Sequence, residues 1–347
     1  MKRFTCPQCG HEVHFDSLKC VRCGQPLALL PSALDMRATD GQGRTQDGWV
    51  ACRNIAAGGC NWLAAPGSES GYCTACEHNK TVPNLDNPSH REKWKELELA
   101  KRQLIFELLS WSLDCPTKAE EPETGLAFDF LADTQTPDGK TVAVSTGHSL
   151  GLITLNIAEG DEIERAERKR DLHEPYRTVI GHLRHEIGHY YWMRLVHGTS
   201  DLEECRRLFG DDRADYGEAL QTHYAGPPPA GWQQSFISAY ATAHPWEDFA
   251  ETWAHWMHIV DGLETAEAYG VFGVTSGQGD SVYRSEDVEH MIGRWVHLTV
   301  TVNSLNRGMG QPDFYPFVLS DPVIEKMRFI NRLIHKNAAK APGVIAQ

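Results

Sequence analysis

Residues Gly181–Trp192 read GHLRHEIGHYYW and place two histidines, His185 and His189, four positions apart. Residues four apart on a helix lie one turn apart on the same face, so both imidazoles can reach one metal ion. Glu186 follows the first histidine and can serve as a general base, taking a proton from metal-activated water and delivering it to a leaving amine. Apolar residues recur around the motif at helical spacing. The stretch therefore predicts a helix that carries a zinc-dependent hydrolytic site.

A catalytic zinc needs a third protein ligand, and the best candidates lie in Pro245–Trp253, PWEDFAETW. Glu247 falls in the first turn of the helix predicted here, and Glu251 lies one turn later on the same face. We expect Glu247 to bind zinc and Glu251 to accept a hydrogen bond from the outer nitrogen of a ligand histidine. The alternative is that both are solvated carboxylates. If Glu247 lay away from the histidines, Glu251 or Asp248 would replace it.

Tyr240 lies seven residues before Glu247. Its phenol could donate a hydrogen bond to the oxyanion that develops in a tetrahedral intermediate, and a packed core tyrosine is the equal alternative. His148 is kept as a minor site candidate. The other histidines near these segments are expected to be packing, surface or structural residues: His182, His255 and His258.

Eight of the ten cysteines lie before residue 80, in two sets of four. The first set has two Cys-x-x-Cys pairs, each followed by glycine: Cys6, Cys9, Cys20 and Cys23. The second set contains one such pair: Cys52, Cys60, Cys73 and Cys76. Four thiolates at this spacing predict one structural zinc per set, and redox or loosely packed cysteines are the alternative. His78 is a spare ligand candidate for the second set, whereas Cys115 and Cys205 are expected to be small, partly buried residues.

The chain has 347 residues, 41% of them apolar, and a formal net charge of −14. An acidic chain has no general attraction for phosphate backbones, so nucleic acid is an unlikely partner. Neither a signal peptide nor an apolar stretch of membrane-spanning length is expected. Because no secretory signal is expected, the cysteines favour metal binding over disulfides. The same observation favours a cytoplasmic location.

We expect three parts: a zinc ribbon over residues 1–30, a connector with the second zinc-binding segment over 31–88, and a helical linker with a catalytic domain over 89–347. Strands precede helices, so the fold class is α+β with a small sheet. The expected strands cover 126–131 and 141–157, with a turn at Gly147 and His148 and an edge strand over 151–157. The expected helices are listed by range: 89–113 with Ser89 as N-cap, 161–171 as a helix or turn, 175–197 beginning at Pro175, 201–209, 213–224, 230–243, 246–260, 285–304 and 321–337.

The two motif segments together with the N-terminal cysteines resemble a bacterial family of zinc-binding metallopeptidases that carry zinc ribbons. The resemblance covers nearly the whole chain. The spacing of Tyr240, Glu247 and Glu251 is also similar to the gluzincin peptidases, especially the lethal-factor group. That likeness implies a zincin-like catalytic domain in which Glu247 is the third zinc ligand and Tyr240 contributes to transition-state binding. The gap between His189 and Glu247 is longer here, which implies a helical insertion over 201–243.

These observations predict a zinc metallopeptidase with one catalytic and two structural zinc ions. Water activated by zinc and Glu186 would attack a peptide carbonyl held along strand 151–157 by β-addition. The alternatives are a catalytically idle scaffold or interaction protein and a zinc amidase that acts on small molecules. A peptide or protein is the expected substrate, and the ribbons could bind a protein partner. We also expect the ribbons, the connector or the insertion to restrict access to the cleft.

Overall fold

The computed structural model describes residues 2–136, 138–144, 146–161, 178–271 and 281–338. The chain forms two compact units, Lys2–Leu183 and a second from Arg184 onward, and each is described by itself. Apart from Asp161, the charged segment expected over 161–171 lies outside the described residues, as does the helix start expected at Pro175.

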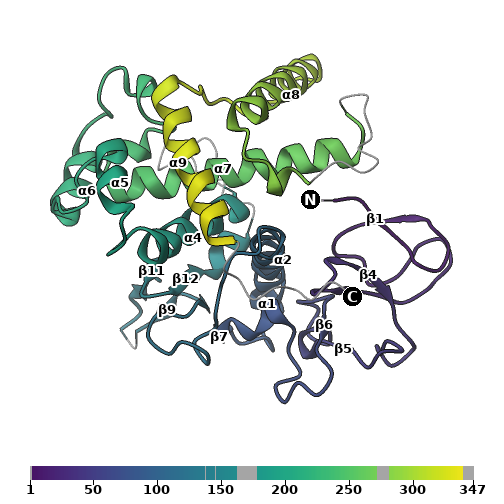
Figure 1. The fold of residues 1–347 in the computed structure, drawn as a ribbon. Coiled ribbons are helices and arrows are strands. Elements are labelled where there is room, and N and C mark those ends of the chain that lie inside the picture. The colour runs from purple at the N-terminus through teal and green to yellow at the C-terminus, as the bar shows by residue number, and fades with distance from the viewer. Residues whose placement is uncertain (1, 137, 145, 162–177, 272–280, 339–347) are drawn as a thin grey trace. The chain divides into compact units, whose positions relative to one another are not determined.

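The first unit begins with three antiparallel hairpins of very short strands (Figure 1). They are β1 (Phe4–Thr5) with β2 (Glu12–Val13), β3 (Leu27–Leu30) with β4 (Asp35–Ala38), and β5 (Val50–Ala51) with β6 (Leu63–Ala64). Two short helical pieces follow β5 and β6: η1 (Arg53–Ile55) and α1 (Thr74–Glu77). Strands this short bury little apolar surface, so the hairpins need additional cross-links to be stable.

Helix α2 (Pro88–Ser110) forms a shared core for this unit. Its Phe106 ring packs edge-on against Phe4 and Phe15, with centroids 6.0 and 5.6 Å away. Its buried Lys101 lies over the rings of Phe128 and Phe130 from the sheet. The segment expected to be a linker therefore packs on both the hairpins and the sheet. The division of the chain into three parts stays a prediction.

The expected cap of α2 is wrong. The N-cap is Asn87, whose side chain accepts hydrogen bonds from the backbone N–H groups of Ser89 and His90. Pro88 takes the first helical position, where its missing N–H costs nothing. Ser89 therefore lies inside the first turn.

The main sheet has the strand order β11-β12-β8-β7, made of β11 (Gly147–Ser149), β12 (Leu152–Asn156), β8 (Ala127–Leu131) and β7 (Asn79–Thr81). Strand β8 runs parallel to both β12 and β7, and β11 runs antiparallel to β12. A separate pair joins β9 (Thr134–Gln135) to β10 (Thr141–Val142), and η2 (Ile157–Gly160) follows β12. The mixed α+β composition with small sheets is confirmed.

The expectation of an edge strand over 151–157 is wrong. Ile153 on β12 pairs with His148 on one side and with Phe128 on the other, so both hydrogen-bonding edges of β12 are used. The turn lies at Leu150 and Gly151, not at Gly147 and His148, because both turn residues adopt positive φ, 46° and 83°. Such a two-residue turn matches strand twist and lets Gly147–Ser149 pair as the edge strand β11. A peptide cannot add to β12.

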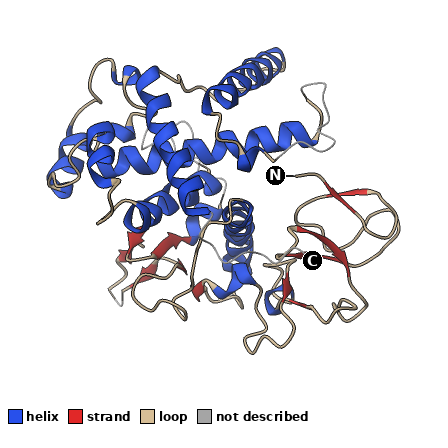
Figure 2. Ribbon diagram, viewed as in Figure 1, coloured by secondary structure: helices blue, strands red, loops and turns tan. Residues whose placement is uncertain are grey.

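The second unit is helical among its described residues (Figure 2). Its α-helices are α4 (Val179–Leu195, shared at its start with the first unit), α5 (Leu202–Phe209), α6 (Tyr216–Ala225), α7 (Pro245–Ala268), α8 (Val288–Gly308) and α9 (Asp321–Ala338). Shorter turns are η3 (Trp232–Gln234), η4 (Tyr240–Thr242) and η5 (Val282–Arg284). The helix expected over 230–243 is wrong, because Gly231 adopts φ 74° and only the two 3₁₀ turns η3 and η4 form there.

Helix α7 is the centre of this unit and packs against α5, α8 and α9. Its Phe249, Trp253 and Trp256 are completely buried. Tyr191 of α4 stacks on Trp253 with ring centroids 5.0 Å apart. Burying these large rings on one helix holds α4 against α7, so the two motif helices have a defined relation. None of the described helices is both long and apolar enough to cross a membrane.

Candidate metal centres

Three side chains from α4 and α7 converge at one point in the second unit. The Nε2 atoms of His185 and His189 lie 3.1 Å apart. Glu247 Oε2 lies 3.0 Å from His185 Nε2, and Glu247 Oε1 lies 3.5 Å from His189 Nε2. All three residues are at least nine-tenths buried. The structure thus brings together the two histidines of the motif and the predicted third ligand.

This arrangement fits a zinc ion. Tetrahedral ligands at about 2.0–2.1 Å from zinc lie about 3.3–3.4 Å from one another, close to the three separations observed. Glu247 Oε2 is buried and has no hydrogen-bond partner among the described residues, although it lies beside an imidazole nitrogen. Lone pairs that face one another in a buried space repel unless a proton or a metal ion lies between them. The donor set of two imidazoles and one carboxylate is typical of catalytic zinc, which leaves a fourth position open.

The charges around this point also favour a cation. Burial opposes a charge on His185, but the neighbouring carboxylates of Glu247 and Glu251 raise the pKa of its imidazole well above its usual range. Burial would raise the pKa of the Glu247 carboxyl, yet the two imidazoles hold it far below its usual range. Glu186 is buried as well, with 5% of its surface exposed. A group of buried carboxylates around two imidazoles needs positive charge, which a divalent ion supplies.

Gly188 allows the two helices to come this close. A Cβ atom at this position would lie 2.9 Å from Ala250 Cα and 3.1 Å from Trp253 Cβ on α7. Real Cβ atoms do not approach that closely, so any other residue would push α4 and α7 apart. The glycine inside the motif therefore brings the histidines of one helix to the glutamate of the other.

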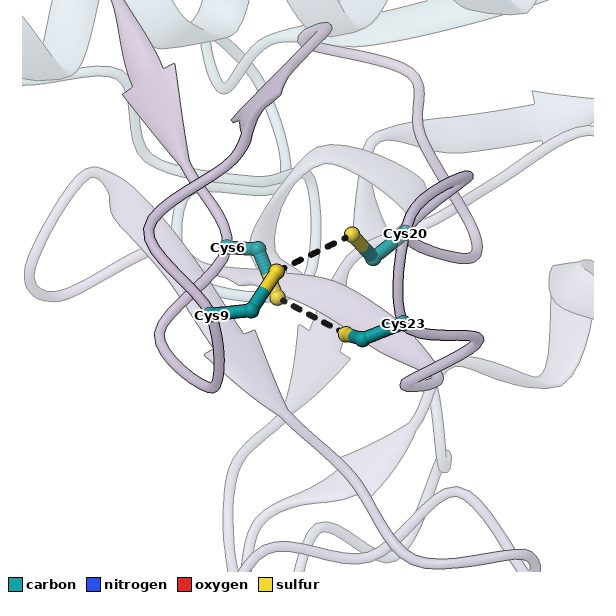
Figure 3. Close-up of side chains that lie close together, drawn as sticks. All are labelled: Cys6, Cys9, Cys20 and Cys23. Carbon is teal, nitrogen blue, oxygen red and sulfur yellow. Dashed lines mark hydrogen bonds between the residues drawn. The ribbon is translucent and has the colours of Figure 1, made fainter.

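The two cysteine sets converge in the first unit (Figure 3 shows the first set). Sulfur atoms lie 3.7 Å apart in the pairs Cys6–Cys23 and Cys9–Cys20, and 3.6 Å apart in Cys60–Cys73. Four thiolates at about 2.3 Å from zinc lie about 3.8 Å from one another, whereas disulfide sulfurs lie about 2.05 Å apart. None of the ten cysteines, all of which are described, forms a disulfide. These distances fit two four-thiolate zinc sites.

Backbone geometry supports both cysteine sites. Gly10 and Gly24 adopt φ of 70° and 75°, which closes a tight turn after each Cys-x-x-Cys pair of the first set. In the second set, the N–H of Trp62 points at Cys60 Sγ, and that of Cys73 points at Cys52 Sγ. Such N–H groups stabilise thiolate charge. His78 is not part of the group that converges at the second set; its Nδ1 contacts the Leu126 carbonyl, and burial lowers its pKa to about 4.

Residues 90–333 match the protein family described as "Putative zinc-binding metallo-peptidase". The chain belongs to this family. Residues 3–87 match a zinc-ribbon domain, which covers both cysteine sets. Uncharacterized proteins from Mycobacterium tuberculosis and Mycobacterium bovis are 39% identical to the chain over 339 residues, which cover 97% of this chain and 96% of each relative. No solved structure is significantly similar.

Sequence reasoning missed two residues that contact the carboxylates of the candidate zinc site. Tyr216 on α6 donates a hydrogen bond to Glu247 Oε1 over 2.7 Å. Ser238 donates to Glu251 Oε2 over 2.5 Å, while Glu251 Oε1 lies 2.7 Å from His185 Nδ1. Glu251 therefore holds the outer nitrogen of His185 and turns its Nε2 toward His189 and Glu247. No periodic pattern links Tyr216 or Ser238 to the motifs, so the sequence offered no signal for them.

Tyr240 on η4 lies beside the centre, with its ring centroid 5.9 Å from that of His185. Burial and the nearby Glu247 charge raise the pKa of this phenol, so it remains a protonated donor. Asp248 points elsewhere and pairs with Lys326 Nζ at 2.6 Å. His255 Nδ1 lies 2.8 Å from the Tyr315 hydroxyl.

Two other histidines near the motif segments also have local partners. His258 contacts the Arg184 guanidinium. His148 accepts a hydrogen bond from the Gly151 backbone in the turn between β11 and β12.

Proposed function

We propose that this chain is a zinc-dependent metallopeptidase with a gluzincin-like catalytic centre. His185, His189 and Glu247 would hold the catalytic zinc. The observation that carries the proposal is the convergence of their three ligand atoms, with Glu247 Oε2 buried and lacking a hydrogen-bond partner among the described residues. A zinc ion held there supplies a Lewis acid and lowers the pKa of water toward neutrality.

The surrounding residues supply the rest of the chemistry. The Glu186 carboxylate takes a proton from the attacking water and passes it to the leaving amine, which is the role of a general acid–base group. The Tyr240 hydroxyl, kept protonated, donates to the oxygen of the carbonyl as negative charge develops on it. Glu251 and Ser238 keep the His185 ring in one orientation. Membership of a zinc-binding metallopeptidase family supports this assignment.

We further propose that the two cysteine sets each hold one structural zinc, so that the chain binds three zinc ions. The expected substrate is a peptide or protein, and the ribbons are a candidate surface for a protein partner. The net charge of −14 disfavours nucleic acid. We keep the cytoplasm as the expected location. Because β12 is an internal strand, it has no free edge to hold the substrate.

Replacing Glu186 by Gln tests the reaction. The variant should keep its zinc and lose hydrolysis of casein and of quenched fluorescent peptides by at least about a hundredfold, since general acid–base groups contribute that much. Glu96→Gln, an exposed site on α2, is the matched control and should leave both unchanged.

Two results would favour the alternatives. Hydrolysis that is absent from both the parent and the variant, with three zinc ions bound and partner capture retained, supports an idle scaffold. Turnover of small amides without peptides, lost on Glu186→Gln, supports a small-molecule amidase.

A further inference from the structure

Helix α6 lies against the candidate zinc site of the second unit. Its first residue, Tyr216, donates its phenol to Glu247 Oε1 over 2.7 Å, and Glu247 is the proposed third ligand. The Tyr216 ring also packs against His244 and Trp246, with centroids 5.3 and 5.8 Å away. Near the other end of α6, His223 lies edge-on to Tyr240, 5.7 Å between centroids. One helix thus contacts both a proposed ligand and the proposed oxyanion donor.

A second link joins the segment before α6 to α7. His244 is the N-cap of α7, and its Nδ1 accepts a hydrogen bond from the Trp246 backbone. The other ring nitrogen, Nε2, must then carry the proton, and it donates to the Ala214 carbonyl over 3.1 Å. Both links from this region therefore end on the first turn of α7, the turn that carries Glu247.

A third and longer contact joins His223 Nδ1 on α6 to Thr242 Oγ1 on η4 over 3.5 Å. Apart from these links, α6 is thinly packed. Among the described residues, no member of this ten-residue helix is buried. Tyr216 and Tyr224 keep 39% and 62% of their surface exposed. The helix is followed by Gly226 and three prolines, which cannot continue it. Elements with few buried contacts and exposed backbone hydrogen bonds open at low free energy.

We propose that α6 is a lid on the catalytic centre, closed by the Tyr216–Glu247 and His244–Ala214 hydrogen bonds, and that Tyr216 is a positioning residue for the zinc ligand Glu247. The inference rests on the proposed function. When the lid is closed, the phenol holds the outer oxygen of Glu247 and stands beside the ligand set. A peptide that reaches the centre must displace Tyr216, so the closed form disfavours generic unfolded substrates.

Two measurements on the full-length, zinc-loaded protein test the lid without any substrate. The first is the rate of tryptic cleavage after Arg213, an exposed residue just before α6, followed by mass spectrometry. The second is the rate at which the chromogenic chelator 4-(2-pyridylazo)resorcinol takes the most labile zinc.

The variants are Tyr216→Phe, which removes only the hydroxyl, and His244→Ser, which keeps a helix cap but loses the link to Ala214. Tyr269→Phe, at the other end of α7, is the matched control.

Both variants should speed cleavage after Arg213, because each removes one of the two hydrogen bonds that close α6 over the centre. Tyr216→Phe should also release the labile zinc about tenfold faster, which follows the lower range of the affinity lost with an outer partner of a metal ligand. The control should match the parent chain. Unchanged cleavage in both variants would show that α6 is a fixed wall and would overturn the lid. Faster cleavage with unchanged zinc release would overturn the positioning role of Tyr216. If both rates respond but no form of the protein hydrolyses peptides, the proposed function fails and the lid stands.

Discussion

Replacing Gly188 by Ala should separate α4 from α7. The added Cβ would lie 2.9 Å from Ala250 Cα, whereas carbon atoms in contact lie about 3.5–4.0 Å apart, so the helices must part by about 0.6–1 Å. Overpacking of this kind costs about 1–3 kcal/mol. Alanine gains about 1 kcal/mol over glycine in helix propensity. The two effects oppose each other, and the variant should be less stable by about 0–2 kcal/mol.

The larger effect should be on metal binding. His185 and His189 lie on α4 and Glu247 lies on α7, so separating the helices draws the carboxylate away from both imidazoles. We expect the affinity for the labile zinc to fall about ten- to a hundredfold, as when an outer partner of a ligand is lost. Stability and zinc affinity should thus respond very differently to one methyl group.

Gly293→Ala on α8 is the matched control, because a Cβ there would meet none of the described atoms within 4 Å. It should stabilise the protein by about 1 kcal/mol and leave zinc binding unchanged. Urea unfolding followed by circular dichroism measures stability, and competition with a chromogenic chelator measures zinc affinity. If Gly188→Ala were as stabilising as the control and kept its zinc equally well, the close approach of α4 and α7 would be refuted.

Three further predictions concern a buried ion pair, a buried histidine and the metal content. Lys326→Met should destabilise the protein by about 3–5 kcal/mol in urea unfolding, because it removes the 2.6 Å cationic partner of a buried carboxyl, which must then stay charged and unpaired or take up a proton. Burial raises the pKa of Asp248 to about 7 even beside Lys326, so the cost should be larger above pH 7 than below it. The Asp248→Asn/Lys326→Met double variant should cost less, and an equal or larger cost would contradict this. Burial lowers the pKa of His255 to about 4, so the folded protein keeps it neutral while the unfolded chain takes up a proton below about 6.5. Stability should therefore fall as the pH drops from 6.5 toward 4, by about 1.5 kcal/mol between pH 6.5 and 5 for this residue. His255→Gln should lose that much less than the parent chain over the same interval, and equal losses would exclude His255 as the cause. Elemental analysis of undialysed protein should find three zinc ions, of which a mild chelator removes one and leaves the two held by cysteine. A content of no more than one, or loss of all three together, would contradict the assignment.

Groups of site residues that are close in sequence could be predicted from the sequence, because local backbone geometry alone brings these residues together. His185 and His189 share a helix face at four-residue spacing, and each Cys-x-x-Cys pair shares one tight turn. The same four-residue spacing aligns Glu247 with Glu251 on one face of α7. These predictions required only that a segment is helical or turns sharply. Most of the helices were found for the same reason, since their apolar spacing is regular.

The tertiary structure alone decided the contacts that join distant segments. Tyr216 reaches Glu247 from a different helix, and Ser238 reaches Glu251 from a loop, and no spacing rule relates them. The internal position of β12 depended on pairing with β8 and β11, which the alternation of its own residues does not encode. Periodicity shows which face of an element is apolar, but which partner covers that face is settled only when whole surfaces pack. The sequence therefore determined which residues could bind metal, and packing of α4, α6 and α7 decided which other side chains hold those ligands in place.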